Sequence, residues 1–344
     1  CKHRSCPICA DKARHNWIED QKKRLLNCAH YHVIFTLPHE YLPLWQYNRK
    51  WFTKAIFKVC RDTLISLLED KKYLGATPGI LMTLHTWGRQ LNYHPHVHCL
   101  VTAGGITQTS DWKALEGDFL LPIRVVKALY RGKLQSYIKA ALKNDELKIP
   151  AGCSQDEVKR IIKSVYEKQW SVRIQEKYSH GKGVVLYLAR YMKGGPINPK
   201  QIISCKSKIT FLYKDHRDQK IKPLSLKIED FMRRILWHVP ETGIHVVRHF
   251  GIYASKSQKK RDCCRQVIGG LKETDVKAGK ELKSTLDWCC GECGETLRCM
   301  FSVFLPSRYE NSYRVRAGRV YVQQDVQADI AYVPQIRGPC GIVR

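Results

Sequence analysis

The sequence predicts an α+β fold in which a small antiparallel sheet carries helices on one face. Residues 32–37 form a β-branched and aromatic run closed by Pro38, and residues 80–87 and 96–103 are two further β-prone runs. The stretch between those two runs contains turn-forming residues, so we expect them to pair as a hairpin. Apolar residues recur at helical spacing between residues 44 and 68, which predicts one or two helices.

The remaining segments alternate between expected helices and short strands. Residues 111–180 alternate charged and apolar positions in helical fashion, which predicts a largely helical, basic insertion. The other expected elements are a basic helix at 15–26, a short helix at 183–193, strands at 201–204 and 208–213, a helix at 228–237 and an exposed basic connector at 256–261. We find no internal repeat in the sequence.

The charge of the chain points to nucleic acid as its partner. Fifty-nine Lys and Arg residues face 31 Asp and Glu residues, a formal net charge of +28 over 344 residues. Such a surface repels itself unless a polyanion shares it. No apolar run reaches the roughly 18 residues of a membrane span, and no secretory signal is recognised. We therefore expect a cytoplasmic, nucleoid-associated protein with further residues upstream of Cys1 and no membrane partner; the sequence does not indicate its protein partners.

Cysteines cluster at the two ends of the chain, in spacings typical of zinc ligands. Near the start stand Cys1, Cys6 and Cys9, and near the end Cys290 and Cys293 form a C-x2-C pair. A C-x2-C turn directs two thiolates at one ion, which predicts Zn²⁺ at both clusters. Free thiols are the alternative. Other candidate ligands are His3 or His15 for the first cluster and Cys299, Cys263 or Cys264 for the second.

The segment from His94 to His98 holds three of the 14 histidines of the chain. Residues two apart on a strand face the same side, so His96 and His98 would present two imidazoles to one metal ion. Pairing across the hairpin places His85 roughly opposite His98, as a candidate third ligand. Gln90 or His94 could take that place in a different register. The alternative is a set of ordinary surface or core histidines.

Tyr187 and Tyr191 are four residues apart on the helix expected at 183–193, so both phenols share one face. Arg190 and Lys193 lie beside them as candidate DNA-binding cations. A phenol titrates near ~10 and needs a neighbouring cation or metal to act as a nucleophile. By spacing alone, ordinary packing explains such a pair better than catalysis does.

A strand bearing His-hydrophobic-His, followed by a helix bearing Tyr, is the order of parts in HUH endonucleases. Five segments, at residues 6–9, 31–40, 84–88, 94–100 and 187–191, together resemble the rolling-circle insertion-sequence transposases of the IS-ninety-one (IS91) type. The resemblance covers the chain to about residue 295. It departs at the start, where that family has further cysteines upstream of the position of Cys1, so the first zinc site is expected to be incomplete.

The resemblance implies an HUH-type, ferredoxin-like or RRM-like antiparallel sheet core flanked by small zinc-binding modules. It implies that His96 and His98 hold Mg²⁺ or Mn²⁺, that Tyr187 and Tyr191 are paired nucleophiles, and that the cysteine clusters bind zinc. The corresponding domains are a zinc module at 1–29, a core at 30–215 with the helical insertion at about 111–180, and an accessory region at 216–344 with a zinc knuckle near 289–299.

The implied function is a DNA transposase that cleaves and transfers single-stranded DNA through 5′-phosphotyrosine intermediates. Its partners would be the transposon end and the target strand, lying across the sheet with Trp87, Tyr93 and Trp112 as candidate base-stacking residues. A plasmid replication initiator or relaxase would share the histidine strand and the tyrosines but not the zinc modules. A non-catalytic zinc protein that binds nucleic acid would leave the tyrosine pair unexplained.

Overall fold

The protein is described from a computed structural model, which covers residues 7–178, 196–197 and 201–268 and, beyond them, short strands between residues 288 and 342. For residues 7–15 it describes the backbone alone. The chain divides into two compact units, Cys1–Leu282 and Lys283–Arg344. Each unit is described by itself, and the first unit carries the candidate site.

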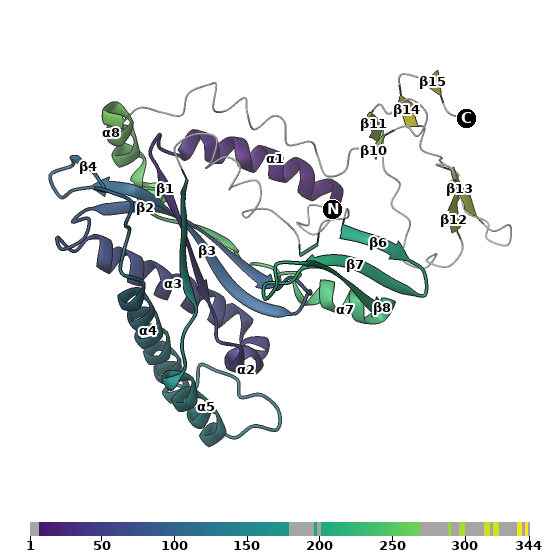
Figure 1. Cartoon of the computed structure of the whole chain (residues 1–344), viewed down its shortest axis with the longest axis horizontal. Helices are drawn as coiled ribbons and strands as arrows, with labels where there is room; N and C mark the ends of the chain where they lie inside the picture. Colours follow the sequence, from purple (N-terminus) through teal and green to yellow (C-terminus); the bar gives the residue numbers. More distant parts are fainter. Residues whose placement is uncertain are drawn as a thin grey trace. The chain divides into compact units, whose positions relative to one another are not determined.

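An antiparallel sheet forms the centre of the first unit (Figure 1). Its strand order is β5-β1-β3-β2-β9, and β4 pairs with the far end of β3. The strands are β1 (His30–Thr36), β2 (Thr77–Trp87), β3 (Tyr93–Ile106), β4 (Trp112–Ala114), β5 (Val172–Tyr178) and β9 (Val247–Gly251). The predicted α+β class and the predicted hairpin at 80–103 are confirmed, because β2 and β3 pair antiparallel.

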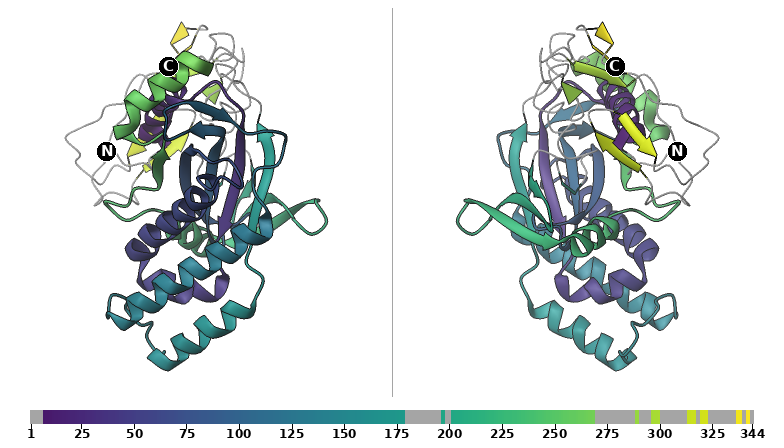
Figure 2. Two further views of the ribbon diagram at one scale, coloured as in Figure 1. Left: turned by 90° about the vertical axis from the view of Figure 1, so that its left-hand side faces the viewer. Right: turned by 90° about the vertical axis from the view of Figure 1, so that its right-hand side faces the viewer.

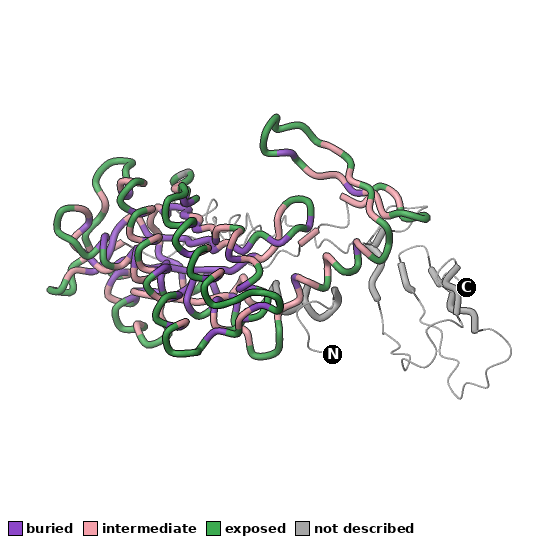
Figure 3. Tube along the Cα trace, turned by 90° about the horizontal axis from the view of Figure 1, so that it is seen from below, coloured by how far each residue is buried: buried purple, intermediate pink, exposed green. Residues whose placement is uncertain are grey.

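Helices cover one face of this sheet and bury the main core against it (Figure 1). They are η1 (His39–Tyr41), α2 (Leu42–Tyr47), α3 (Arg49–Leu68), α4 (Ile123–Lys143) and α5 (Gln155–Glu167). Alternate residues of the strands, among them Val33, Phe35 and Val97, are fully buried beneath the helices because side chains alternate between the faces of a strand. Figure 3 shows this core as the dense purple region of the chain.

On part of the opposite face of the sheet, two described helices form a second core with the strands. Helix α1 (Pro7–Arg24) and helix α8 (Gln258–Ile268) contribute to this second core with Leu81 and Leu100 of the sheet. Nε2 of His249 on β9 lies 2.7 Å from Oε1 of Gln21 on α1. Gly251 ends β9 with φ +58°, and a Cβ there would lie 1.8 Å from the carbonyl oxygen of Pro78, so only glycine fits. This covered half lies beside the strand segments that carry the histidines.

A separate three-stranded sheet packs against one helix. It consists of β6 (Ile202–Cys205), β7 (Lys208–Lys214) and β8 (Ile221–Lys227), followed by α7 (Ile228–Trp237). Phe211 and Phe231 form a small core between this sheet and α7, together with Leu91 from the turn between β2 and β3. The predicted strands at 201–204 and 208–213 and the predicted helix at 228–237 are confirmed.

Two predictions for local structure are wrong in part. Residues 172–178 of the predicted helical insertion form β5, an edge strand of the central sheet, because apolar residues alternate there with polar ones. The predicted exposed connector at 256–261 is exposed at residues 256 and 258–260 as expected, but it is not irregular, because it contains η4 (Ser255–Ser257) and the start of α8. Arg261 is buried there, with Nη1 donating to the carbonyl oxygens of Ile252 and Ala254 at 3.1 and 2.6 Å.

The second unit contributes four antiparallel strand pairings among its described residues. Strand β11 (Thr296–Cys299) pairs with β10 (Trp288–Cys289) and with β14 (Ile336–Gly338), which pairs with β15 (Gly341–Ile342). Strands β12 (Tyr313–Arg316) and β13 (Arg319–Val322) form a hairpin of their own. Within the described part of the chain, none of the helices combines the length and the apolar character that crossing a membrane requires.

Candidate metal centre and its surroundings

Three histidines converge on the face of the sheet that also carries the second core, with His85 and His98 buried and His96 half-buried. His85 lies on β2, and His96 and His98 lie two residues apart on β3. One nitrogen from each of the three rings lies within 4.8 Å of the others. Among the described residues, no other group of three or more histidine, cysteine or acidic side chains lies close enough to share a metal ion. Imidazole nitrogen suits a first-row divalent ion, so the donor set fits a metal site.

The register of the hairpin differs by two residues from the predicted one. His85 is the direct partner of His96, whereas Thr83 is the partner of His98. An irregularity between His85 and Trp87 shifts the pairing near the turn. The three rings still share one face, because directly opposite residues do so, and the His85 and His98 rings have a centroid distance of 4.5 Å.

Hydrogen bonds orient two of the three rings. Nδ1 of His96 lies 2.6 Å from the carbonyl oxygen of His94. A carbonyl only accepts, so Nδ1 carries the proton and the lone pair of Nε2 stays available for a ligand. Nδ1 of His98 lies 2.8 Å from Nε2 of His32 on β1, so a proton on Nδ1 likewise leaves Nε2 of His98 for a metal. Second-sphere contacts of this kind fix the tautomer and the orientation of ligating histidines.

The protonation state of the cluster also suits a metal. Burial and the neighbouring His85 lower the pKa of His96 and His98 well below the usual value for histidine. Burial lowers the pKa of His32 to about 4. These imidazoles are therefore neutral at neutral pH, which is the form that binds a divalent ion.

Aromatic and cationic side chains border the histidines at the turn end of the hairpin. The Trp87 ring stacks on His85 with a centroid distance of 4.4 Å. His238, at the end of α7, has Nδ1 3.1 Å from Oγ1 of Thr86 and Nε2 3.1 Å from the carbonyl oxygen of Leu91. Tyr93 stacks on Trp237 at 5.0 Å and accepts a 2.6 Å hydrogen bond from Arg49. This network fixes the turn beside the cluster.

The candidate stacking residues differ in how much of their ring is accessible. Trp87 is half-buried, and one ring face rests on His85. Tyr93 is buried against Trp237. Trp112 is half-buried and packs against the second core, beside Gly104. Trp87 is therefore the one of the three that adjoins the histidine cluster.

Most of the other predicted site residues lie outside the described residues. These are Tyr187, Tyr191, Arg190, Lys193, Cys1, Cys6, Cys290 and Cys293, and the expected helix at 183–193 lies there with them. Cys9 is described only by its backbone, within α1. The alternative zinc ligand Cys264 is buried in the second core, which raises the pKa of its thiol to about 11. A thiol held protonated in an apolar core is a poor zinc ligand.

His32 is the residue near the site that we did not single out from the sequence. The sequence does contain a pattern that points to it, because His30 and His32 are two residues apart on a strand, as His96 and His98 are. The two diverge in the fold: Nε2 of His30 lies 2.6 Å from the hydroxyl of Tyr253, while His32 contacts His98. The spacing alone could not show which of the two reaches the metal ligands.

An antiparallel sheet that carries a histidine cluster able to hold a metal ion, in a strongly basic chain, fits the class of metal-dependent proteins that act on nucleic acid. The comparisons with known proteins agree with this class. The family described as "Putative transposase" matches residues 79–261, and the family described as "Transposase zinc-binding domain" matches residues 1–37. The chain belongs to the transposases of the IS91 type.

Two curated relatives support this assignment. The "Putative transposase y4qJ" of Sinorhizobium fredii (strain NBRC 101917 / NGR234) is 29% identical over 277 residues, 78% of this chain and 70% of the relative. The "Transposase for insertion sequence element IS801" of Pseudomonas savastanoi pv. phaseolicola is 34% identical over 258 residues, 74% of this chain and 62% of the relative. No solved structure matches the chain significantly.

Proposed function

We propose that this transposase cleaves and rejoins single-stranded DNA with Tyr187 and Tyr191 as nucleophiles and with His85, His96 and His98 as ligands of Mg²⁺ or Mn²⁺. The observation that carries the proposal is the convergence of the three imidazoles within 4.8 Å on an antiparallel sheet. The family match supports an enzyme acting on DNA, and the resemblance of residues 187–191 to the family supplies the tyrosines.

The proposed reaction conserves the energy of the phosphodiester bond. A tyrosine hydroxyl oxygen attacks the phosphorus, the bond from phosphorus to the 3′ oxygen breaks, and the departing 3′ oxygen takes up a proton. The product is a 5′-phosphotyrosine with a free 3′-hydroxyl, and reversal on a second strand joins that strand without a nucleotide cofactor. A divalent ion at the histidines would polarise the scissile phosphate and offset its developing negative charge.

Each of the site residues would have a separate role, set by its position. His96 and His98 hold Nε2 toward the ion because their Nδ1 atoms are engaged by His94 and His32. Arg190 and Lys193 would neutralise phosphates beside the tyrosines, and Trp87 would stack a base next to the cluster. An HUH-type, ferredoxin-like sheet is the fold that this arrangement would require.

The zinc-binding match at residues 1–37 supports Zn²⁺ in this protein. We propose Cys1, Cys6 and Cys9 as ligands of the first site and Cys290 and Cys293 as ligands of a second. The predicted domains at 1–29, 30–215 and 216–344 remain part of this proposal. Zinc in closed thiolate sites would be structural, whereas the histidine site needs an open position for the phosphate.

The test is a metal-dependent covalent adduct. Protein, Mn²⁺ and end-labelled single-stranded DNA carrying the transposon end are incubated, denatured and separated on a gel. We expect a labelled protein band that depends on Mn²⁺ and is absent for His96→Ala. No adduct under these conditions, or an adduct of equal yield in His96→Ala and in EDTA, would contradict the proposed function.

A further inference from the structure

The sheet formed by β6, β7 and β8, called the β6–β8 arm below, has two unlike faces. Ile209, Phe211 and Tyr213 of β7 and Leu224 and Leu226 of β8 face α7 and pack around it. The alternate residues therefore form an outer face. Thr210 and Ser225 confirm this division, since their hydroxyl oxygens lie 2.8 Å apart across the two strands.

The outer face carries three lysines and no acidic side chain, together with the apolar residues Leu212, Ile221 and Pro223, of which Ile221 and Pro223 are exposed. Lys208, Lys214 and Lys227 are exposed on it, and Lys208 is the direct cross-strand partner of Lys227. Like charges directly opposite each other destabilise a sheet by themselves. Among the described residues, none of these three lysines forms an ion pair. An external anion bound over Lys208 and Lys227 would offset the repulsion between their two positive charges.

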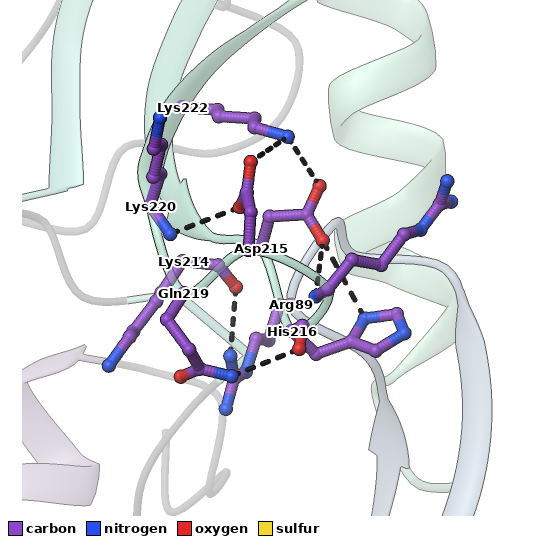
Figure 4. Close-up of polar contacts among 9 residues, drawn as sticks. Arg89, Lys214, Asp215, His216, Gln219, Lys220 and Lys222 are labelled. Carbon is purple, nitrogen blue, oxygen red and sulfur yellow. Dashed lines mark hydrogen bonds and ion pairs between the residues drawn. The ribbon is translucent and has the colours of Figure 1, made fainter.

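Two acidic residues in the turn between β7 and β8 are already paired with a lysine. Figure 4 shows Lys222 reaching the carboxylate of Asp215, at 2.8 Å, while the Lys214 side chain extends away from this network. Lys222 also pairs with Asp218 at 2.9 Å. A hydrogen bond from the backbone N–H of Arg217, followed by the contact with Lys222, lowers the pKa of Asp215 to about 2, so its carboxylate stays charged and engaged within the turn. The lysines of the outer face are therefore available to bind an anionic partner.

The arm is fastened to the hairpin that carries the histidine cluster. Leu91, in the β2–β3 turn, is 1% exposed and sits between Phe211 and Phe231 of the arm and α7, with φ +60°. A left-handed backbone is costly for leucine, and burial of its side chain offsets that cost. Two further contacts hold the turn: Nη1 of Arg89 donates to the carbonyl oxygen of Lys214 at 2.9 Å, and Nη1 of Arg234 donates to that of Gln90 at 2.9 Å.

We propose that the outer face of the β6–β8 arm binds the phosphate backbone of double-stranded DNA next to the cleavage site. This inference rests on the proposed function, because it assigns the flanking duplex to a surface distinct from the histidine cluster. In Figure 2 the green hairpin of β7 and β8 projects beyond the central sheet, so a rod of duplex can lie along it. Phosphates would accept from Lys208, Lys227 and Lys214.

The composition of the face favours duplex over single-stranded DNA. Single-strand binding surfaces combine cations with exposed aromatic rings on which bases stack. The aromatic residues of β7, Phe211 and Tyr213, point toward α7 instead. Besides aliphatic residues such as Ile221, the outer face offers cations and the hydroxyls of Thr210 and Ser225 but no aromatic ring, which is the chemistry of backbone contact without base stacking.

The test compares Lys208→Gln/Lys227→Gln with the control Lys139→Gln/Lys163→Gln, whose lysines are exposed on α4 and α5. Affinity for a fluorescent 20-base-pair duplex and for one of its strands is measured over a salt series. Each lost duplex contact makes the log–log salt slope less negative by about 0.9. We expect a change of roughly 1.8 for the arm variant, a loss of affinity of at least about tenfold at 0.1 M salt, a smaller loss on the single strand, and no change for the control.

Thermal melting separates binding from folding in the same samples. Removing the opposed charges of Lys208 and Lys227 should leave the melting temperature unchanged or raise it. Unchanged duplex affinity and slope in the arm variant, equal losses in both variants, or a larger loss on the single strand would overturn the proposal. The adduct assay, run on the unaltered protein, reports separately on the proposed function: an adduct without an arm effect rejects the arm alone, and an arm effect without an adduct rejects the cleavage chemistry alone.

Discussion

Nε2 of His32 lies 2.8 Å from Nδ1 of His98, and their rings stack at a centroid distance of 5.0 Å across β1 and β3. One imidazole thus orients another that faces the candidate metal position. A contact of this kind holds a ligand in the correct tautomer before the metal arrives, and its loss typically costs about 10- to 100-fold in metal affinity.

His32→Ala should therefore weaken Mn²⁺ binding by about 10- to 100-fold while the protein stays folded. His32→Gln, whose amide oxygen can accept from Nδ1 of His98, should recover part of the affinity. Isothermal titration with Mn²⁺ measures both variants. His30→Ala is the matched control, because His30 is on the same strand and contacts Tyr253 instead. Equal affinities of His32→Ala and the unaltered protein would show that His32 does not position His98.

His96→Ala and His98→Ala should each abolish cleavage and leave DNA retention largely intact. Each substitution removes one candidate metal ligand, whereas affinity for DNA is dominated by phosphate contacts of the basic surface. Adduct formation and filter binding are measured on the same preparations. Cleavage at the unaltered rate in either variant would remove that histidine from the metal centre, and loss of DNA retention would indicate a folding defect.

Zinc and the catalytic metal should form two separable populations. After extensive dialysis, elemental analysis should find zinc in proportion to the intact cysteine sites, while cleavage should still require added Mg²⁺ or Mn²⁺. Cys6→Ser/Cys9→Ser should lower the retained zinc and leave residual Mn²⁺-dependent cleavage. Zinc-free purified protein would contradict the thiolate sites. If zinc removal instead stopped cleavage without altering DNA binding, the two metals would be assigned to the wrong sites.

His249 should make the stability of the protein sensitive to acid. Burial and the neighbouring Arg24 and Arg261 lower the pKa of His249 to about 4, against about 6.5 in an unfolded chain. The unfolded state therefore binds the extra proton first as pH falls, and folded stability declines between about pH 6.5 and pH 4. His249→Gln should lose less stability than the unaltered protein across that window.

Urea unfolding at pH 7, 5.5 and 4 measures this difference. His39→Gln serves as the control, since the His39 side chain is 85% exposed. The control should follow the unaltered protein at all three pH values. An identical pH dependence for His249→Gln and the unaltered protein would mean that the contact between α1 and β9 is not acid-sensitive.

The sequence predicted those elements whose signal is local. The hairpin bearing His96, the helix at 228–237 and the face shared by His85, His96 and His98 follow from periodicity and turn residues. Pairing partners far apart in the chain were not predictable in this way. β9 pairs with β2 although their partner residues are about 170 positions apart in sequence, and β5 was hidden within a helical pattern.

The exact register and the arm also depend on tertiary contacts. The irregularity between His85 and Trp87 arises where the turn is held by Leu91 and His238, so the strand sequences alone placed His85 opposite the wrong histidine. Arg261 looked like part of an exposed basic run, yet its guanidinium satisfies two carbonyls at the end of β9. A basic residue can be buried when it serves backbone acceptors in this way.

The most direct test of the central claim is the identity of the residue that becomes linked to DNA. The Mn²⁺-dependent adduct is digested with nuclease and protease, and mass spectrometry locates the peptide that retains a nucleotide. We predict the mass addition on Tyr187 or Tyr191, with no adduct in Tyr187→Phe/Tyr191→Phe. A nucleotide attached to any other residue, or an adduct that persists in the double variant, would contradict the account.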